Sequence, residues 1–364
     1  MKPTLRAVID VGRGCNLRCI FCYYKHQSLR GFKNLSNLKI EIMKAKIRGN
    51  KFLDFTGGEP TLFPKIIDLI KFATSLGLST CVITHGQNLL KNKLVDKLID
   101  AGVDDFLISI HGVEEVHDRL TNSKGGFERV NELINYLKRR NFSFRTNTVI
   151  TNWNYHQFDR LRRYLISIKP RIVNFINFNP YYGWESNMET GKILVPCSES
   201  SPYIKECITL LEKENIGVNV RYYPFCQLRN FEKNICNMPQ VMFDPYEWDY
   251  GVKPKTIKKY LKFSINELGE MCTFSERCLK CSIRKICGGI NKEYYRIFGD
   301  KEILPYTLED EITDVYYYRK RTLSRTIYIE KSFIQNQKVI KRTNFLTGNR
   351  ITLSLKLYKL KYFI

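Results

Sequence analysis

Three cysteines close to the N-terminus, Cys15, Cys19 and Cys22, are spaced as CxxxCxxC in the segment GCNLRCIFCYY. Cysteine thiolates are the usual ligands of iron–sulfur clusters, and four of them close a cubane [4Fe-4S] cluster. Three thiolates leave one iron free, so this spacing predicts a cluster that can bind a small molecule. The alternative is a zinc site with His26 as fourth ligand, although zinc sites are usually built from CxxC pairs.

A second motif, the GGEP element that follows Thr56, comes after the short strand-like run 51–55. Together with CxxxCxxC and the aromatic Phe21 before its last cysteine, this element resembles the radical S-adenosylmethionine (SAM) enzymes. In that family the free iron chelates the amino and carboxylate groups of SAM, and the loop after the second strand meets the methionine amino group. The resemblance implies that the reduced cluster cleaves SAM to a 5'-deoxyadenosyl radical, which abstracts hydrogen from an unactivated carbon. It also implies SAM contacts at Gly57, Gly58, Glu59 and Pro60, and an external electron donor of the flavodoxin or ferredoxin type.

Apolar runs alternate with amphipathic stretches from residue 4 to residue 181. The runs fall at 5–11, 52–55, 80–84, 106–110, 144–150 and 172–178. The amphipathic stretches include 64–76, 89–101 and 127–137. This alternation predicts an α/β fold with parallel strands and crossover helices, specifically a partial TIM barrel of the (β/α)6 type, which is also the core fold of the resembled family.

The loops after the strands of such a barrel converge on one rim, where barrel enzymes keep their sites. The third loop reads Thr84-His85-Gly86-Gln87, whereas the resembled family often has Thr-Asn-Gly near the ribose and adenosine. Ser109 resembles a position that faces the ribose or the methionine carboxylate, and strand alternation points Asn147 into the barrel. Thr84, Ser109 and Asn147 are therefore expected SAM contacts.

Four further polar residues near the rim are candidates for ligand binding. Asn177 and Asn179 are expected to face the barrel interior, with hydrogen-bonded core or loop amides as the alternative. His85 and His111 are expected at the rim, where either could donate a proton or bind substrate. His117 is expected on the surface, because six residues separate it from His111 and place the two on different helical faces.

A second group of cysteines lies in the C-terminal half, at Cys226, Cys236, Cys272, Cys278, Cys281 and Cys287. No signal-peptide pattern and no run of ~18 apolar residues is present, so a cytoplasmic location and metal binding are expected rather than disulfides. The CxxCx5C spacing of the last three resembles the SPASM and Twitch extensions, which hold auxiliary [4Fe-4S] clusters. Asn291 stands where the full SPASM pattern has its next cysteine, so one auxiliary cluster is expected. Its fourth ligand is expected to be Cys226, at a strand end, with Cys272 or Cys236 as alternatives, and zinc held by four thiolates also remains open.

The chain is expected to comprise a radical SAM core at 1–225, an auxiliary-cluster domain at 226–300 and a C-terminal extension at 301–364. In the extension, 344–349 reads as a turn and 351–357 alternates as an edge strand or hairpin. Lysines interleave with aromatic residues at its end, which favours a charged edge strand over a surface for RNA or anionic lipid.

The chain of 364 residues carries 59 Lys and Arg against 36 Asp and Glu, a net charge of +23. This balance favours an anionic substrate, although solvated basic faces explain it equally well. A sugar, nucleotide-linked or lipid-linked substrate is favoured, and RNA is a further candidate. A peptide is less favoured, because the first strand starts by residue 5 and no leader-binding domain precedes it. The alternative function is that of a non-catalytic iron–sulfur electron-transfer protein or a zinc-stabilised nucleic-acid-binding protein.

Overall fold

The computed structural model describes residues 6–27, 30–181, 183–237, 271–314 and 317–318. The turn at 344–349, the strand at 351–357 and the basic aromatic end expected from the sequence lie outside these residues. Among the residues that are described, no helix is long and apolar enough to cross a bilayer.

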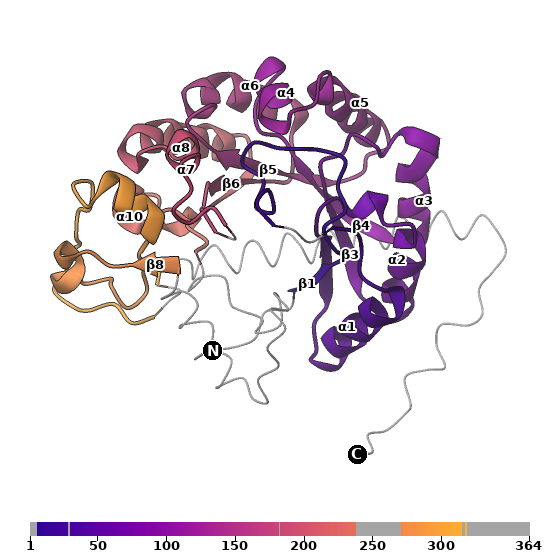
Figure 1. Ribbon diagram of the computed structural model, residues 1–364, viewed down its shortest axis with the longest axis horizontal. Helices are drawn as coiled ribbons and strands as arrows, with labels where there is room; N and C mark the ends of the chain where they lie inside the picture. Colours follow the sequence, from indigo (N-terminus) through magenta and orange to yellow (C-terminus); the bar gives the residue numbers. More distant parts are fainter. Residues whose placement is uncertain (1–5, 28–29, 182, 238–270, 315–316, 319–364) are drawn as a thin grey trace, which may run out of the picture. The chain divides into compact units, whose positions relative to one another are not determined.

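Seven parallel strands form one sheet, in which every strand pairs with the next strand along the chain. The strands are β1 (Arg6–Asp10), β2 (Phe52–Thr56), β3 (Ser79–Thr84), β4 (Val103–Ser109), β5 (Phe144–Ile150), β6 (Ile172–Asn177) and β7 (Gly217–Arg221). The sheet curves, and its helices lie along the outer side (Figure 1). The predicted partial barrel is confirmed, and β7, which follows the six strand–helix units, pairs in register with β6 as a seventh strand.

The helices that cover the sheet bury one face each. In α5, the buried residues recur at three- and four-residue steps, which is the pattern of an amphipathic helix packed on a core. The covering helices are α1 (Leu35–Ile47), α2 (Ile66–Ser75), α3 (Leu94–Ala101), α4 (Glu115–Thr121), α5 (Gly126–Arg139), α6 (Phe158–Ile168) and α8 (Cys197–Lys213).

Two helices begin elsewhere than their sequence pattern suggests. Helix α3 starts at Leu94 rather than at residue 89, because Asn92 and Lys93 both have a φ of 52°, which interrupts a right-handed helix. Helix α8 starts at Cys197. Pro202 favours a start five residues later, because proline is common in the first turn of a helix. The Cys197 N–H donates to the hydroxyl of Tyr294 at 2.7 Å, so a distant residue satisfies a helix-end donor.

A row of buried ionic side chains crosses the sheet near the amino ends of the strands. Arg145 on β5 donates to Asp105 on β4 at 2.5 Å, and its guanidinium also lies 3.6 Å from Asp54 on β2. Arg6 pairs with Asp54 at 2.5 Å, and Arg171 pairs with Asp105 at 3.1 Å. The charges are thus paired inside the fold, away from the loops at the carboxyl ends.

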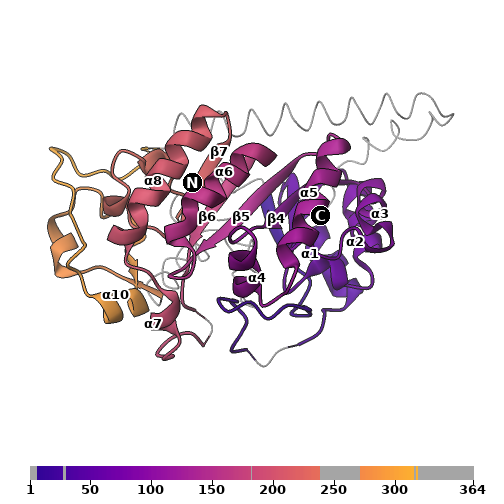
Figure 2. The ribbon, with the colours of Figure 1, turned by 90° about the horizontal axis from the view of Figure 1, so that it is seen from above.

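The C-terminal cysteine-rich segment contains a two-stranded antiparallel pair, β8 (Cys272–Thr273) and β9 (Ile290–Asn291), followed by α10 (Lys292–Phe298). This segment lies beside the end of the sheet that carries β6, β7 and α8 (Figures 1 and 2). Asn291 caps α10 by accepting from the Glu293 N–H at 2.8 Å, and it donates to Asn179 after β6 at 2.9 Å. The residue at the missing SPASM cysteine position therefore joins the segment to the barrel.

Candidate functional site

The three N-terminal cysteines lie together in the loop that follows β1. Cys15 is exposed, and Cys19 and Cys22 are half-buried. Burial raises the pKa of the Cys19 thiol, and the neighbouring charges of Cys22 and Cys15 raise it further. The loop thus groups three thiols at the carboxyl end of the first strand.

The GGEP loop after β2 interlocks with this cysteine loop. The Gly58 N–H donates to the Gly12 carbonyl and the Glu59 N–H to the Gly14 carbonyl, both at 2.8 Å. A Cβ at Gly57 or Gly58 would lie 2.3 or 2.4 Å from one of these carbonyl oxygens, and Gly57 also has a φ of +139°. Close packing of the two loops therefore requires both glycines.

The Glu59 side chain is completely buried, and other groups of the protein donate hydrogen bonds to it. Its carboxylate accepts from the backbone N–H of Thr61 at 3.0 Å, from the hydroxyl of Thr84 at 2.8 Å and from the His85 N–H at 2.9 Å. The carboxylate therefore fixes the third rim loop against the second. Contact of Glu59, Pro60 or Thr84 with SAM stays a prediction.

His85 extends this connection to the cysteine loop. Its Nδ1 accepts from the Gln87 N–H at 3.1 Å, which leaves the proton of the neutral ring on Nε2. Nε2 lies 2.9 Å from Oδ1 of Asn16, the residue after Cys15, so the ring donates to the cysteine loop. The sequence pattern did not indicate Asn16, because its role depends on a contact with a residue 69 positions away.

Ser109, the last residue of β4, lies opposite Asn147, which is in the middle of β5. Among the described residues, the Asn147 Oδ1 atom is buried without a hydrogen-bond partner. A buried acceptor without a donor is costly, so this position fits a ligand that brings a hydroxyl or an amino group. Contact of Ser109 or Asn147 with SAM stays a prediction.

The expectation that His117 lies on the surface is wrong. Its ring is fully buried, it stacks on His111 with the centroids 5.9 Å apart, and its Nδ1 accepts from the His111 N–H. The helical-face argument failed because His111 lies in the loop before α4, which folds back over the helix. Burial lowers the pKa of His117 to about 4, so the ring is neutral near pH 7. Phe21 of the cysteine loop packs edge-on against His111 at 4.5 Å.

Four of the C-terminal cysteines line one pocket of about 400 Å³, the auxiliary pocket. They are Cys226, Cys278, Cys281 and Cys287. The N–H groups of Gly289 and Tyr306 donate to the sulfurs of Cys287 and Cys281, each at 3.4 Å.

The two alternative fourth ligands lie elsewhere. Cys272 lines a different pocket, and the Cys236 sulfur lies 3.3 Å from Oδ1 of Asn219. Across the described ranges, no three His, Cys, Asp or Glu side chains lie close enough together to hold a single metal ion.

Known proteins share these features. Residues 9–165 match the Radical SAM superfamily. The chain is 30% identical over 203 residues to the S-adenosylmethionine-dependent nucleotide dehydratase of Flammeovirga pacifica, covering 52% of this chain and 68% of that protein. It is 31% identical over 154 residues to the AdoMet-dependent heme synthase of Methanosarcina barkeri, covering 42% of this chain and 44% of that protein. The chain therefore spans less than half the length of that second relative.

A solved structure, anSMEcpe with bound AdoMet and the Kp18Cys peptide, has a similar fold. The TM-score is 0.58 at 17% identity, covering 93% of this chain and 100% of that chain. At this identity the likeness concerns the fold alone.

A parallel partial barrel with three cysteines in the loop after its first strand defines a class of cluster-binding enzymes. The chain belongs to this class, the radical SAM superfamily, whose members use a [4Fe-4S] cluster and SAM.

Proposed function

We propose that this chain reductively cleaves SAM at a [4Fe-4S] cluster held by Cys15, Cys19 and Cys22, and that it uses the product radical on an organic substrate. When bound, the cluster supplies one electron to SAM, which yields methionine and a 5'-deoxyadenosyl radical that abstracts a hydrogen atom. An external donor of the flavodoxin or ferredoxin type provides the electron. The interlock of the cysteine loop with the GGEP loop carries the proposal, because it holds three thiols at the rim of the barrel.

The residues of the rim divide into those that shape the site and those that bind SAM. Glu59 and His85 hold three loops in place through the bonds described above. Asn147 and Ser109 face the ligand, and the unpartnered Oδ1 of Asn147 accepts from it. The backbone at Gly57, Gly58 and Pro60 and the side chain of Thr84 complete the proposed contacts.

A second [4Fe-4S] cluster is proposed in the auxiliary pocket, with the four cysteines that line it as ligands. All four cysteines line the same pocket, which supports Cys226 as the expected fourth ligand. The proposed chain organisation is a core at 1–225, an auxiliary-cluster domain at 226–300 and an extension at 301–364.

The proposed substrate is a nucleotide-linked or other phosphorylated small molecule. The relative from Flammeovirga pacifica is named as a nucleotide dehydratase, and the net charge of +23 favours an anionic molecule. The solved structure with a peptide bound makes a peptide the second candidate.

The substitution Cys19→Ala tests the proposed cleavage. We expect the reconstituted, dithionite-reduced variant to form no 5'-deoxyadenosine above background, since two thiolates do not hold the cluster. Chromatography of the nucleoside products measures this. Cys207→Ala is the matched control, because Cys207 is a buried thiol of α8 whose sulfur lies 3.8 Å from the Phe158 carbonyl. Unchanged product formation by Cys19→Ala would contradict the proposal, whereas absence of product from the wild type would favour the non-catalytic alternative.

A further inference from the structure

The cysteine loop crosses the rim of the barrel and contacts the segments that follow β2, β3, β4 and β6, in that order. Its first residues bond to the GGEP loop after β2, and Asn16 bonds to His85 after β3. The Ile20 N–H then donates to a carbonyl of α4, which follows β4, at 2.9 Å. Finally, the Cys22 carbonyl accepts from the indole N–H of Trp184, which follows β6, at 3.1 Å. The first and last cysteines of the motif are therefore held by different parts of the barrel.

Trp184 is itself fixed from several sides. The residue is fully buried. The Thr190 hydroxyl donates to its backbone carbonyl at 2.6 Å, and Phe178 packs edge-on against the indole with the ring centroids 5.0 Å apart. A buried indole N–H needs an acceptor, and the Cys22 carbonyl is that acceptor here. The bond therefore joins a rigid side chain to the backbone of a cysteine.

Two weaker contacts join the same segments just after Cys22. The Lys25 ammonium lies 2.6 Å from the Glu189 carboxylate, and both side chains are exposed. The His26 ring packs edge-on against the Trp184 indole, with the centroids 4.5 Å apart. An exposed ion pair contributes little to stability, so the buried bond of Trp184 is the main connection at this end of the loop.

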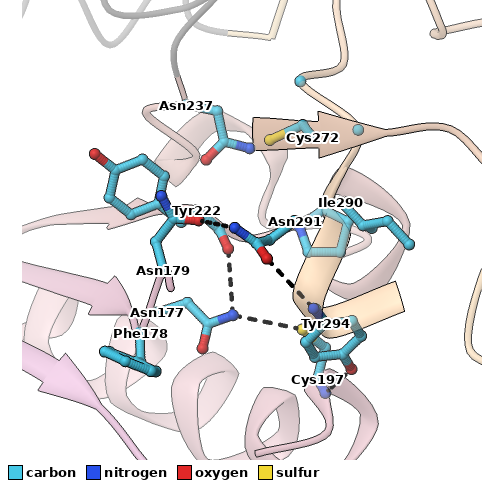
Figure 3. Close-up of a pocket in the computed structure, with 13 residues that line it drawn as sticks. Asn177, Phe178, Asn179, Cys197, Tyr222, Asn237, Cys272, Ile290, Asn291 and Tyr294 are labelled. Carbon is cyan, nitrogen blue, oxygen red and sulfur yellow. Dashed lines mark hydrogen bonds between the residues drawn. The ribbon is translucent and has the colours of Figure 1, made fainter. Parts of the chain in front are cut away.

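The stretch before Trp184 also contacts the C-terminal cysteine-rich segment. Asn291 donates to Oδ1 of Asn179 at 2.9 Å and to the Pro180 carbonyl at 3.1 Å (Figure 3). Phe178, which packs on Trp184, is the neighbour of Asn179 in the chain. Trp184 is therefore supported by a part of the barrel that does not contact the Cys15 end of the loop through any bond described above.

We propose that Trp184 is a positioning residue for Cys22, and that it acts independently of the His85 contact at the Cys15 end of the loop. Its indole N–H fixes the Cys22 carbonyl, and with it the backbone from which the Cys22 thiol projects. The relevance to a cluster rests on the proposed function, whereas the hold on the loop is a property of the chain without metal.

Alkylation of the metal-free, full-length chain with iodoacetamide tests the proposal thiol by thiol, with tandem mass spectrometry of the peptides as the readout. Trp184→Phe keeps an aromatic ring but removes the N–H donor. We expect Cys22 to react about fivefold faster than in the wild type, as expected for one lost buried hydrogen bond, and Cys15 to react at the same rate. His85→Phe removes the contact at the other end and should leave the Cys22 rate unchanged.

Trp153→Phe is the matched control, because its indole N–H has no hydrogen-bond partner among the described residues. It should leave the rates of Cys15 and Cys22 unchanged. The buried thiol of Cys207 reports on global opening. If a faster Cys207 shows that Trp184→Phe has lost its fold, Thr190→Val replaces it, because this change removes the hydroxyl that fixes the Trp184 carbonyl.

A spectroscopic measurement separates positioning of the cysteine from stability of the loop alone. The electronic structure of a metal centre depends on the orientation of its ligands. After reconstitution, reduced Trp184→Phe should therefore differ from the wild type in the g values of its electron paramagnetic resonance spectrum, whereas Trp153→Phe should match the wild type.

Three results overturn the proposal: equal Cys22 rates in Trp184→Phe and Trp153→Phe, equal acceleration of Cys15 and Cys22, or unchanged g values. Product formation by Cys19→Ala would contradict the proposed function but leave the alkylation result standing, because that result needs no metal. The two failures are therefore distinguishable.

Discussion

His85 uses both ring nitrogens to join two loops of the site, which the family's usual asparagine could not do in the same way. An asparagine carries its donor and its acceptor at one end of a short side chain. The imidazole instead accepts from Gln87 with one nitrogen and donates to Asn16 with the other. His85 is therefore a positioning residue for the cysteine loop.

The substitution His85→Phe should lower the occupancy of the N-terminal cluster. The phenyl ring retains most of the volume but loses both hydrogen bonds, each worth about 1 kcal/mol. We expect less iron per chain after reconstitution and a smaller electron paramagnetic resonance signal from the reduced cluster. His156→Phe, at an exposed histidine, is the control. Equal iron content and equal spectra in both variants would show that the bridge does not support the loop.

Residue spacing alone identified the cysteine triplet and GGEP, because both motifs are local in the sequence. The contacts that support them are not local. Asn16 and Trp184 became recognisable only in the fold, where Asn16 bonds to His85 at 2.9 Å and the Trp184 indole donates to the Cys22 carbonyl at 3.1 Å. No spacing rule indicates a contact between residues 162 positions apart.

At the level of elements, the alternation of apolar strands and amphipathic helices predicted the barrel, since burial imposes these periods on the sequence. Helix ends were predicted less well. The start of α8 depends on Tyr294, 97 residues downstream, and the seventh strand depends on pairing with β6. The charged row inside the sheet was not predicted either, because Asp54, Asp105 and Arg145 interrupt the apolar strands without a local signal.

The substitution Arg145→Met tests the contribution of that row to the sheet. Removing one partner from a buried ionic network leaves the carboxylates of Asp54 and Asp105 less compensated, and we expect a loss of about 3–5 kcal/mol in the free energy of unfolding. Urea denaturation followed by circular dichroism measures it. The control is Arg163→Met on α6, an exposed partner of Asp159, which should change stability by less than about 0.5 kcal/mol. Equal shifts in the two variants would contradict the assigned role.

At the scale of the whole molecule, the auxiliary pocket draws its cysteines from two distant parts of the chain. Cys226 follows β7 of the barrel, and the other three come from the segment after residue 271. A metal centre in this pocket would therefore bind the C-terminal segment to the barrel and add to the link that Asn291 makes.

Metal content distinguishes the proposed occupants of the two sites. Two [4Fe-4S] clusters correspond to about eight irons and eight sulfides per chain, whereas about four irons and one zinc would support zinc in the auxiliary pocket. We expect Cys281→Ala to lower the iron content to about four. Cys272→Ala, at a cysteine that lines the other pocket, should leave it near eight. A loss of iron from Cys272→Ala instead would make Cys272 the fourth ligand.

The interlock between the Gly12–Gly14 backbone and the GGEP loop has a consequence for maturation. These hydrogen bonds join protein groups only, so they form when the chain folds and do not depend on iron or sulfide. The conformational entropy of ordering the cysteine loop is then lost during folding and not at cluster delivery. An assembly factor that donates a cluster would accordingly meet an acceptor loop whose shape is already set, and transfer would require only exchange of ligands at the metal.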